Sequence, residues 1–200
     1  MQGGPTTNDA PLLAEPERQW LLLLARRSIR HGLDTGAAVP VDLSAQPEAL
    51  QADGAAFVTL HLDGQLCGCI GHLEPIQPLA LDVADNAFAA AFRDPRFPPV
   101  RDAQFDNLHI EISVLTPSRP IAFASEDELI AALRPGIDGV ILAETSAGAE
   151  RRGTFLPSVW EQLPQPRDFL RHLKLKAGLS PEHWSSGIRA WRYGSEAFGE

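Results

Sequence analysis

The sequence predicts an α+β protein with a largely antiparallel sheet flanked by helices. Short apolar runs meet at a strong turn signal, as in "GAAFVTLHL" and "QLCGCIGHL" on either side of Asp63-Gly64, a pattern typical of β-hairpins. Longer amphipathic segments such as residues 78–93 are typical of helices. Because hairpin strands and helices are mixed along the chain, a largely antiparallel α+β architecture is favoured.

The composition describes a globular protein. The chain has 200 residues, of which 44% are hydrophobic, with a net charge of −9 from 17 basic and 26 acidic residues. This charge argues against nucleic acid or an anionic membrane as the main partner, and no apolar run reaches the ~18–20 residues of a membrane span. Two cysteines are too few for a disulfide framework, so we expect a reduced, cytoplasmic protein.

The domain organisation is expected to be simple. Residues 1–14 lack the charged and apolar regions of a signal peptide and are predicted to be a flexible leader. Residues 15–200 are predicted to form a single domain, since no stretch rich in Pro, Gly and Ser divides them.

In the first half of the chain, four patterns predict elements. Apolar residues at helical spacing predict a helix from Glu15 to His31, which Gly32 is expected to end. Asp63-Gly64 predicts a two-residue hairpin turn between two strands. The alanine-rich, amphipathic segment 78–93 predicts a helix, and the alternation of apolar and polar residues over 108–115 predicts a half-buried strand.

The second half continues with shorter elements. Ser125 and Glu128 form a capping-box pattern for a short helix. "DGVILAE" predicts a strand that returns through the turn-rich "TSAGAERR" into "GTFLP". A helix is predicted from Ser158 to about Gln162, another over "RDFLRHLKLKAG" with Gly178 closing it, and a last strand over "GIRAWRYG".

Both cysteines, Cys67 and Cys69, lie in the segment "LCGCIGHLEP". Regular pairing outward from the hairpin turn places Cys67 opposite Leu60 and Cys69 opposite Val58, and side chains two residues apart share a face. Both thiols would then lie on the apolar face with Val58 and Leu60. The simplest interpretation is therefore two small, buried thiols.

Other interpretations of the same segment stay open. A disulfide between Cys67 and Cys69 would close a very tight ring in a strand and would be strained. Cys67, Cys69 and His72 have the types of ligand that zinc accepts, but C-x-C-x-x-H alone is a weak pattern, and no metal site is assigned. Cys69 as a reactive thiolate is the third interpretation, which needs a nearby positive charge or a helix N-terminus.

Several neighbouring residues complete the candidate site. Gly68 and Gly71 would let a substrate or another backbone approach closely. His72 and Glu74 follow the strand and are candidates for proton transfer, which would require burial and matched pKa values.

Arginines on two loops are candidates for anion binding. In "FRDPRFPPV" the prolines hold Arg93, Asp94 and Arg96 on a stiff loop at a helix end, and arginine forks match carboxylate and phosphate. Arg152 precedes a glycine in "RRGTFLPSVW". A solvated Arg–Asp pair and ordinary turn chemistry are the plain alternatives. No Ser-His-Asp order, phosphate-cradling glycine loop or dinucleotide fingerprint is present.

These segments resemble the AmmeMemoRadiSam system protein A family, which is also the domain of the Alport–midface hypoplasia–elliptocytosis region protein. The resemblance spans residues 57–193 through "CGCIGHLEP", "NAFAAAFRDPRFPPV", "IEISVLTP", "DGVIL", "RRGTFLPSVW" and "FLRHLKLKAGL". The family motif Leu-Arg-Gly-Cys-Ile-Gly matches at Gly68, Cys69, Ile70 and Gly71. Cys67 stands where the motif has arginine.

The resemblance implies a two-lobed α+β fold, a large and a smaller lobe with a cleft between them. It also implies association with a Memo-like protein and a radical SAM protein, and the last helix of the family often has a cysteine where this chain has Lys174. The family has no settled activity. If the motif arginine serves Cys69, this chain lacks that group.

Two classes of function therefore follow. The first is an enzyme or enzyme subunit whose site surrounds the CGCIG hairpin, with Cys69 as nucleophile or substrate contact and the arginines holding an anionic small molecule. The second is a non-catalytic protein–protein interaction module in which CGCIG is structural. Neither class calls for a cofactor in this chain.

Overall fold

The computed structural model describes residues 12–146 and 148–200, which divide into two compact units. The first unit comprises the chain up to Leu115 together with Glu196–Glu200, and the second comprises Thr116–Ser195. Most of the leader predicted at residues 1–14 therefore lies outside the described residues. Each unit is described below by itself.

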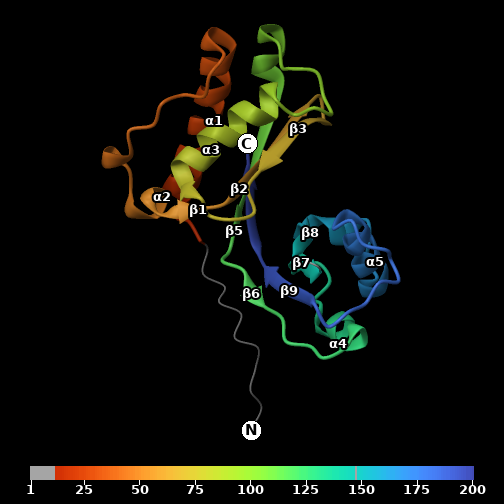
Figure 1. The fold of residues 1–200 in the computed structure, drawn as a ribbon. Helices are drawn as coiled ribbons and strands as arrows, with labels where there is room; N and C mark the ends of the chain where they lie inside the picture. Colours follow the sequence, from red (N-terminus) through yellow and green to blue (C-terminus); the bar gives the residue numbers. More distant parts are fainter. Residues whose placement is uncertain (1–11, 147) are drawn as a thin grey trace. The chain divides into compact units, whose positions relative to one another are not determined.

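The first unit contains two long helices and a four-stranded sheet, with several short elements between them (Figure 1). Its elements are α1 (Glu15–Thr35), α2 (Glu48–Gln51), β1 (Asp53–Gly54), β2 (Ala56–Leu62), β3 (Gln65–Gly71), β4 (Gln77–Pro78), α3 (Leu79–Phe92), β5 (Leu108–Leu115) and β10 (Ser195–Gly199), with single 3-10 turns at Leu43–Ala45 and Asp102–Asn107.

The sheet of the first unit has the strand order β10-β5-β2-β3, and β2 is antiparallel to both β3 and β5. The predicted hairpin is confirmed, with Leu62 paired to Gln65. Asp63 and Gly64 have φ values of 51° and 76°, the left-handed conformations that a tight hairpin turn requires at both positions. The topology makes β3 an edge strand.

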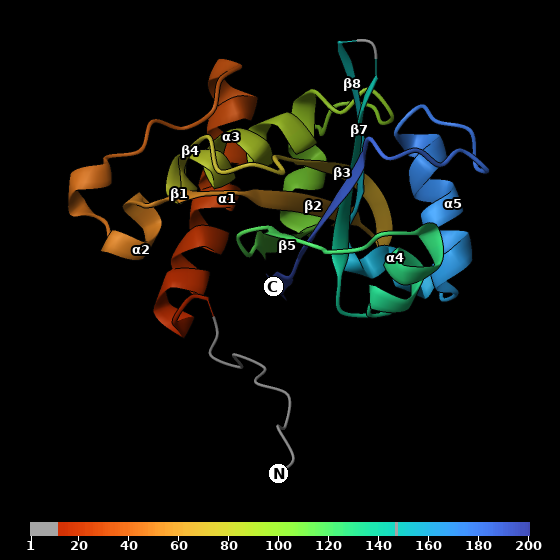
Figure 2. The ribbon, with the colours of Figure 1, turned by 60° about the horizontal axis from the view of Figure 1, so that its bottom comes forward.

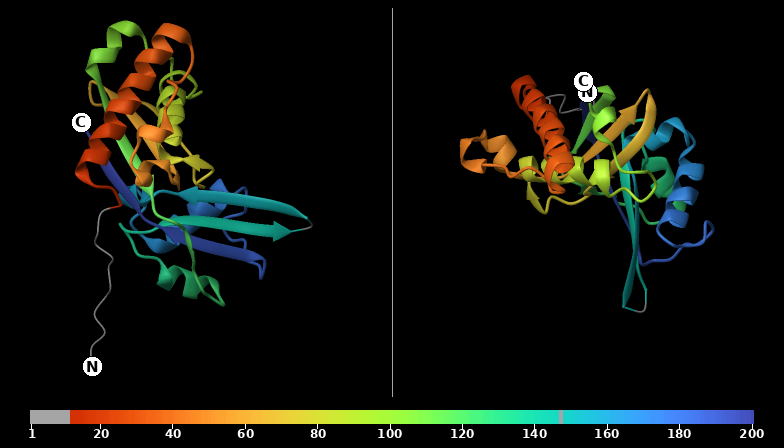
Figure 3. Two further views of the ribbon diagram at one scale, coloured as in Figure 1. Left: turned by 90° about the vertical axis from the view of Figure 1, so that its left-hand side faces the viewer. Right: turned by 90° about the horizontal axis from the view of Figure 1, so that it is seen from above.

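Helices α1 and α3 pack side by side and cover one face of this sheet (Figures 1 and 3). Val58 and Leu60 of β2 and Ile110 and Ile112 of β5 are fully buried beneath them. The small side chains of the alanine-rich α3 allow its backbone to come very near β3. A Cβ on Gly68 would lie 2.1 Å from the carbonyl oxygen of Ala90.

The predicted end of the first helix is wrong. Helix α1 continues past Gly32 to Thr35 and ends at Gly36, which has φ of 77°. Gly32 lies inside the helix because it faces α3, where a Cβ would come within 2.4 Å of the Phe92 ring and 2.7 Å of the Phe88 ring. This glycine is a packing residue and not a helix cap.

The predicted pairing of the cysteines is also wrong. A β-bulge shifts the register between Leu60 and His61, so that Leu60 pairs with Gly68 and Thr59 pairs with Cys69. The extra residue of the bulge is Cys67. Because paired residues share a face of the sheet, Cys69 lies with Thr59, on the face opposite to Leu60.

The second unit contains a four-stranded sheet of order β6-β9-β7-β8. Helix α5 packs against β8, along one side of the β7–β8 hairpin (Figure 2). Its elements are β6 (Arg119–Pro120), α4 (Glu126–Ala132), β7 (Gly139–Ser146), β8 (Ala149–Phe155), a 3-10 turn (Pro157–Glu161), α5 (Pro166–Lys176) and β9 (Ile188–Tyr193).

The core of the second unit is built around aromatic side chains. The rings of Trp160 and Phe169 are stacked with centroids 3.7 Å apart, and Trp160 Nε1 donates a hydrogen bond of 2.7 Å to the carbonyl of Asp138. The predicted cap of α4 is confirmed, since Ser125 Oγ accepts from Glu128 N at 3.2 Å. The segment predicted as a helix from Ser158 forms the short 3-10 turn instead.

The strand pairs β1–β4, β2–β3, β2–β5, β6–β9, β7–β8 and β7–β9 are antiparallel, and helices flank the sheets of both units. The predicted α+β class is therefore confirmed, whereas a cleft between lobes stays a prediction. Within residues 12–146 and 148–200, no helix is both long and apolar enough to cross a membrane.

The contact at Gly68 gives a first prediction. We expect Gly68→Ala to lower the free energy of unfolding by at least about 3 kcal/mol, because the new methyl group meets a main-chain carbonyl that cannot rotate away. Urea denaturation would measure this. Gly194→Ala is the matched control, since its Cβ would find nothing nearer than 3.4 Å. Equal stability losses in the two variants would contradict the prediction.

Candidate functional site

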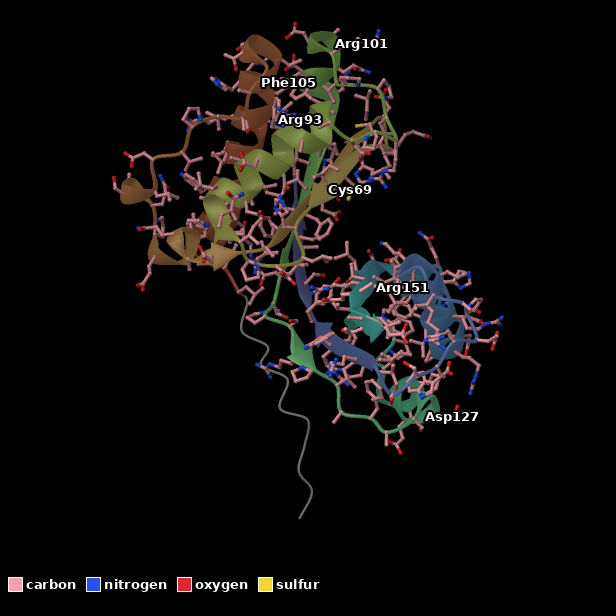
Figure 4. The ribbon with its side chains drawn as sticks, viewed as in Figure 1. Cys69, Arg93, Arg101, Phe105, Asp127 and Arg151 are labelled. Atoms are coloured by element: carbon pink, nitrogen blue, oxygen red, sulfur yellow. The ribbon has the colours of Figure 1, made fainter. Side chains whose placement is uncertain are left out.

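The Cys69 side chain lies on the polar face of the first unit's sheet. Its register partner is Thr59, and the register partner of Thr59 on β5 is Glu111, so the three residues form a row across three strands. The sulfur is half-buried, and Thr59 Oγ1 lies 3.4 Å from it as a hydrogen-bond donor. Figure 4 shows Cys69 on β3. The thiol is therefore not enclosed in the apolar core.

The main chain of Cys69 is held by the loop that follows α3. Cys69 N donates to Asp94 Oδ2 at 2.9 Å, and Arg96 Nη2 donates to the carbonyl oxygen of Cys69, also at 2.9 Å. Because β3 is an edge strand, its outward N–H and C=O groups have no strand partner. The Asp94–Arg96 pair satisfies both groups at Cys69 and closes the sheet edge at that point.

Asp94 and Arg96 also form a two-pronged ion pair with each other. Arg96 Nε donates to Asp94 Oδ1 at 2.9 Å and Nη2 to Oδ2 at 2.7 Å, while the Asp94 side chain is almost fully buried. The Arg96 guanidinium holds the pKa of the Asp94 carboxyl well below its usual range. In turn, hydrogen bonds to Asp94 raise the pKa of Arg96, and burial opposes that rise.

Gly68 and Gly71 are both close-approach positions. Gly68 faces the backbone of α3, and a Cβ on Gly71 would lie 2.5 Å from the carbonyl oxygen of Ala56 and 2.4 Å from the Phe57 ring. In both cases the neighbour is part of the protein itself. Their proposed contact with a ligand stays a prediction.

His72 is oriented by a buried carboxylate. His72 Nδ1 and Asp82 Oδ1 are 2.5 Å apart, a distance that places one proton between them. The Asp82 side chain is fully buried, whereas 40% of the His72 side chain is exposed. In the described part of the chain nothing bonds to His72 Nε2. This ring nitrogen is therefore available for proton transfer.

Asp82 is the centre of a small polar network at the start of α3. Its Oδ2 accepts from Ala56 N at 2.9 Å and from Asn86 Nδ2 at 3.0 Å. Burial raises the pKa of Asp82, and the hydrogen bond from His72 opposes that rise. Asp82 and Asn86 were not predicted from sequence. The available signal was two polar residues four apart on the buried face of an alanine-rich helix.

The remaining predicted site residues, Arg93, Glu74 and Arg152, are exposed. Arg93 ends α3 with its guanidinium 4.8 Å from the centroid of Phe88 (Figure 4). Glu74 follows β3. Arg152 belongs to the second unit, where it pairs with Ala143 in the β7–β8 hairpin. A common site for these residues and Cys69 stays a prediction.

Cys67 differs from Cys69 in its environment. Its thiol packs against the core, donates toward the carbonyl oxygen of Leu60 at 3.4 Å, and has its pKa raised by burial. Both cysteines are free. Within the described ranges, no group of three His, Cys, Asp or Glu side chains converges as a metal ion would require.

Lys174, which stands where the resemblance suggests a cysteine, is a structural residue of the second unit. Its side chain is fully buried. Nζ donates to Glu126 Oε1 at 2.7 Å and to the carbonyl oxygen of Pro181 at 3.2 Å. A buried ammonium must be compensated in this way. Lys174 therefore joins α5 to α4 and to the loop that follows α5.

The fold and the strand with the two cysteines together define an α+β protein. It has two units, each with an antiparallel sheet, and a half-exposed thiol on an edge strand. In sequence, residues 22–198 match the AMMECR1 family. The chain belongs to this family, which confirms the resemblance found in its motifs.

Related proteins match over nearly their whole length. A protein of Methanothermobacter thermautotrophicus is 34% identical over 196 residues, which cover 94% of this chain and 96% of that protein. A protein of Thermotoga maritima is 36% identical over 185 residues, covering 92% and 97%. The crystal structure of an uncharacterized protein from Pyrococcus horikoshii is similar with a TM-score of 0.84, at 32% identity over 95% of this chain and 94% of that one.

The Asp94–Arg96 pair yields a prediction about stability and pH. We expect Asp94→Asn to lower the free energy of unfolding by about 2 kcal/mol at pH 7, because charge-assisted hydrogen bonds to Arg96 are lost. The folded-state pKa of Asp94 is depressed, so its contribution is complete above its unfolded pKa near ~4 and fades as the pH falls below that value.

Denaturation of both proteins between pH 7 and pH 2 would measure this effect. Asp102→Asn is the control, since Asp102 also pairs with an arginine, Arg30, but is 79% exposed and should matter little. A stability difference between wild type and Asp94→Asn that does not shrink in acid would refute the assignment.

The His72–Asp82 contact gives a further prediction. We expect His72→Ala to cost about 2 kcal/mol of stability, because it leaves a buried carboxylate without one of its donors. In an Asp82→Asn background, the stability loss caused by His72→Ala should be smaller by at least about 1 kcal/mol than in the wild type, because the two residues are coupled. Thermal or urea unfolding of the four proteins would show it. His109→Ala, at an exposed position of β5, should be neutral; additive losses would rule out the coupling.

Proposed function

We propose that this protein is an enzyme, or the subunit of one, whose reactive group is the thiol of Cys69. The observation that carries the proposal is a half-buried thiol on a residue to which a hydroxyl and an arginine both bond. Thr59 Oγ1 donates toward the sulfur from 3.4 Å, and Arg96 Nη2 donates to the carbonyl oxygen of Cys69 at 2.9 Å. Reactive cysteines occupy partly exposed, electropositive surroundings of this kind.

The charge balance around Cys69 sets how strongly the thiolate is favoured. Arg96 supplies positive charge, but Asp94 pairs with the same guanidinium and offsets part of it. Glu111, two strands away in the same row, adds negative charge.

Proton transfer is assigned to His72. Asp82 fixes the imidazole through Nδ1 and leaves Nε2 free, which is how a carboxylate orients a catalytic histidine base. Cys69 lies on the face of the sheet away from α3, whereas His72 bonds to Asp82 of α3, so each would contact a different part of a substrate that reaches past the end of β3. Glu74 is the alternative proton carrier, and Arg93 would hold an anionic substrate.

We further propose that the protein acts together with a Memo-like protein and a radical SAM protein. The support is family membership, since the AMMECR1 match covers residues 22–198 and the sequence motifs resemble the family associated with those partners.

A second candidate function is a non-catalytic interaction module. It is favoured by the fact that Asp94 and Arg96 bond to the main chain of Cys69, so that the loop has a structural task without any chemistry at sulfur. The close packing at Gly68 and Gly71 also explains both glycines without a ligand.

Thiol alkylation tests the proposal. The Cys67→Ser protein reports Cys69 alone, and Cys69→Ser reports Cys67. We expect Cys69 to react with iodoacetamide faster than Cys67 at neutral pH, because Cys69 is half-buried on the polar face of the sheet and burial raises the pKa of Cys67. Arg96→Gln should slow the reaction of Cys69 by about tenfold, because it removes the positive charge bonded to this residue.

Two controls separate electrostatics from disorder of the loop. Arg96→Lys keeps the charge and should retain most of the reactivity, and the thermal stability of each variant shows whether the loop is still folded. If Cys69 reacts only after denaturation, or if Arg96→Gln leaves its rate unchanged, the interaction module becomes the better description.

A further inference from the structure

A groove of about 730 Å³ lies beside the β2–β3 hairpin, entirely within the first unit. Its volume is in the range of sites that bind small molecules. One wall is the hairpin and the other is the segment between α3 and β5. The lining residues are Leu62, Gln65, Leu66, Cys67, Phe97, Pro98, Pro99, Val100, Arg101 and Gln104.

The β-bulge shapes this groove. Gln65, Leu66 and Cys67 are consecutive, yet all three line it. In a regular strand, successive side chains point to opposite faces, and the extra residue of a bulge re-aims side chains. The opposite wall is stiff because Pro98 and Pro99 fix their backbone dihedrals. The groove is therefore preformed by the backbone of both walls.

The lining is mainly apolar and contains a single cation. Leu66 is 43% exposed and presents an apolar side chain at the surface of the groove. Arg101 is exposed, and among the described residues it has no carboxylate partner; the neighbouring Asp102 pairs with Arg30 instead. The amides of Gln65 and Gln104 add the other polar groups. Figure 4 shows Arg101 at the start of the segment before β5.

We propose that this groove binds a small amphipathic carboxylate, such as a medium-chain fatty acid. The carboxylate pairs with the Arg101 guanidinium, for which a fork-shaped donor is well suited. The apolar chain lies along Leu66, Phe97 and the two prolines. One cation matches one negative charge, so that a polyphosphate or nucleic acid would leave charges unpaired. The proposal does not require any chemistry at Cys69.

Calorimetry and a thiol reporter test this proposal on the full chain. Decanoate below its micellar concentration is titrated into the Cys69→Ser protein, in which Cys67 is the only thiol. We expect saturable one-to-one binding, and we expect bound decanoate to slow the alkylation of Cys67, which lines the groove. Decanol, which has the same chain but no charge, should bind about tenfold more weakly because it lacks the charge-assisted pair.

Variants locate the site. Arg101→Gln should weaken decanoate about tenfold and leave decanol unchanged, since only the charged pair is lost. Leu66→Glu should weaken both ligands, because it replaces an apolar contact of the chain with a hydrated carboxylate. Leu23→Glu is the matched control, as Leu23 is an exposed leucine of α1, at 62% exposure, outside the groove.

Several results would overturn the proposal. The first is a lack of saturable binding at millimolar decanoate. The second is equal binding of decanoate and decanol that Arg101→Gln does not change. The third is a loss in Leu23→Glu as large as in Leu66→Glu, which would indicate detergent-like adsorption. Protection of Cys67 that depends on protein concentration and not on decanoate would assign the groove to self-association.

Discussion

The close contact between α3 and β3 at Gly68 is the constraint on which the rest of the first unit depends. The Ala90 carbonyl occupies the space that any side chain at position 68 would need. This contact fixes the distance between the helix and the edge strand. Asp94 lies two residues past the end of α3, so the loop that leaves the helix at once reaches the open edge of β3.

The loop after α3 carries out two tasks because it starts so close to the strand. Asp94 and Arg96 satisfy the main chain of Cys69, and residues 97–101 form a wall of the groove beside Cys67. The bulge at Cys67 thus places the two cysteines in different environments. Cys69 meets charged and hydroxyl groups, whereas Cys67 meets apolar ones.

Local patterns predicted most of the fold. The strand at 108–115, the helix near 78–93 and the Ser125 cap depend on nearby residues, and the structure contains them all. The bulge at Cys67 could not be predicted, because a hairpin turn determines only the pairs next to it. The packing role of Gly32 could not be predicted, because the rings that lie against it belong to Phe88 and Phe92, which are far away in the sequence. Asp82 was missed since its partners, Ala56 and His72, come together only in the folded protein.

The division of the first unit into two sequence segments has a consequence for the order of folding during synthesis. Strand β10 pairs with β5, but the whole second unit is made between them. Until then one edge of β5 has no partner, and an open edge is a template for misassociation. At the junction, Thr116 N bonds to the Gly194 carbonyl at 2.9 Å and Gly194 N to Thr116 Oγ1 at 2.7 Å. A folded second unit therefore brings its own ends together and removes most of the loop-closure entropy that β10 would otherwise face.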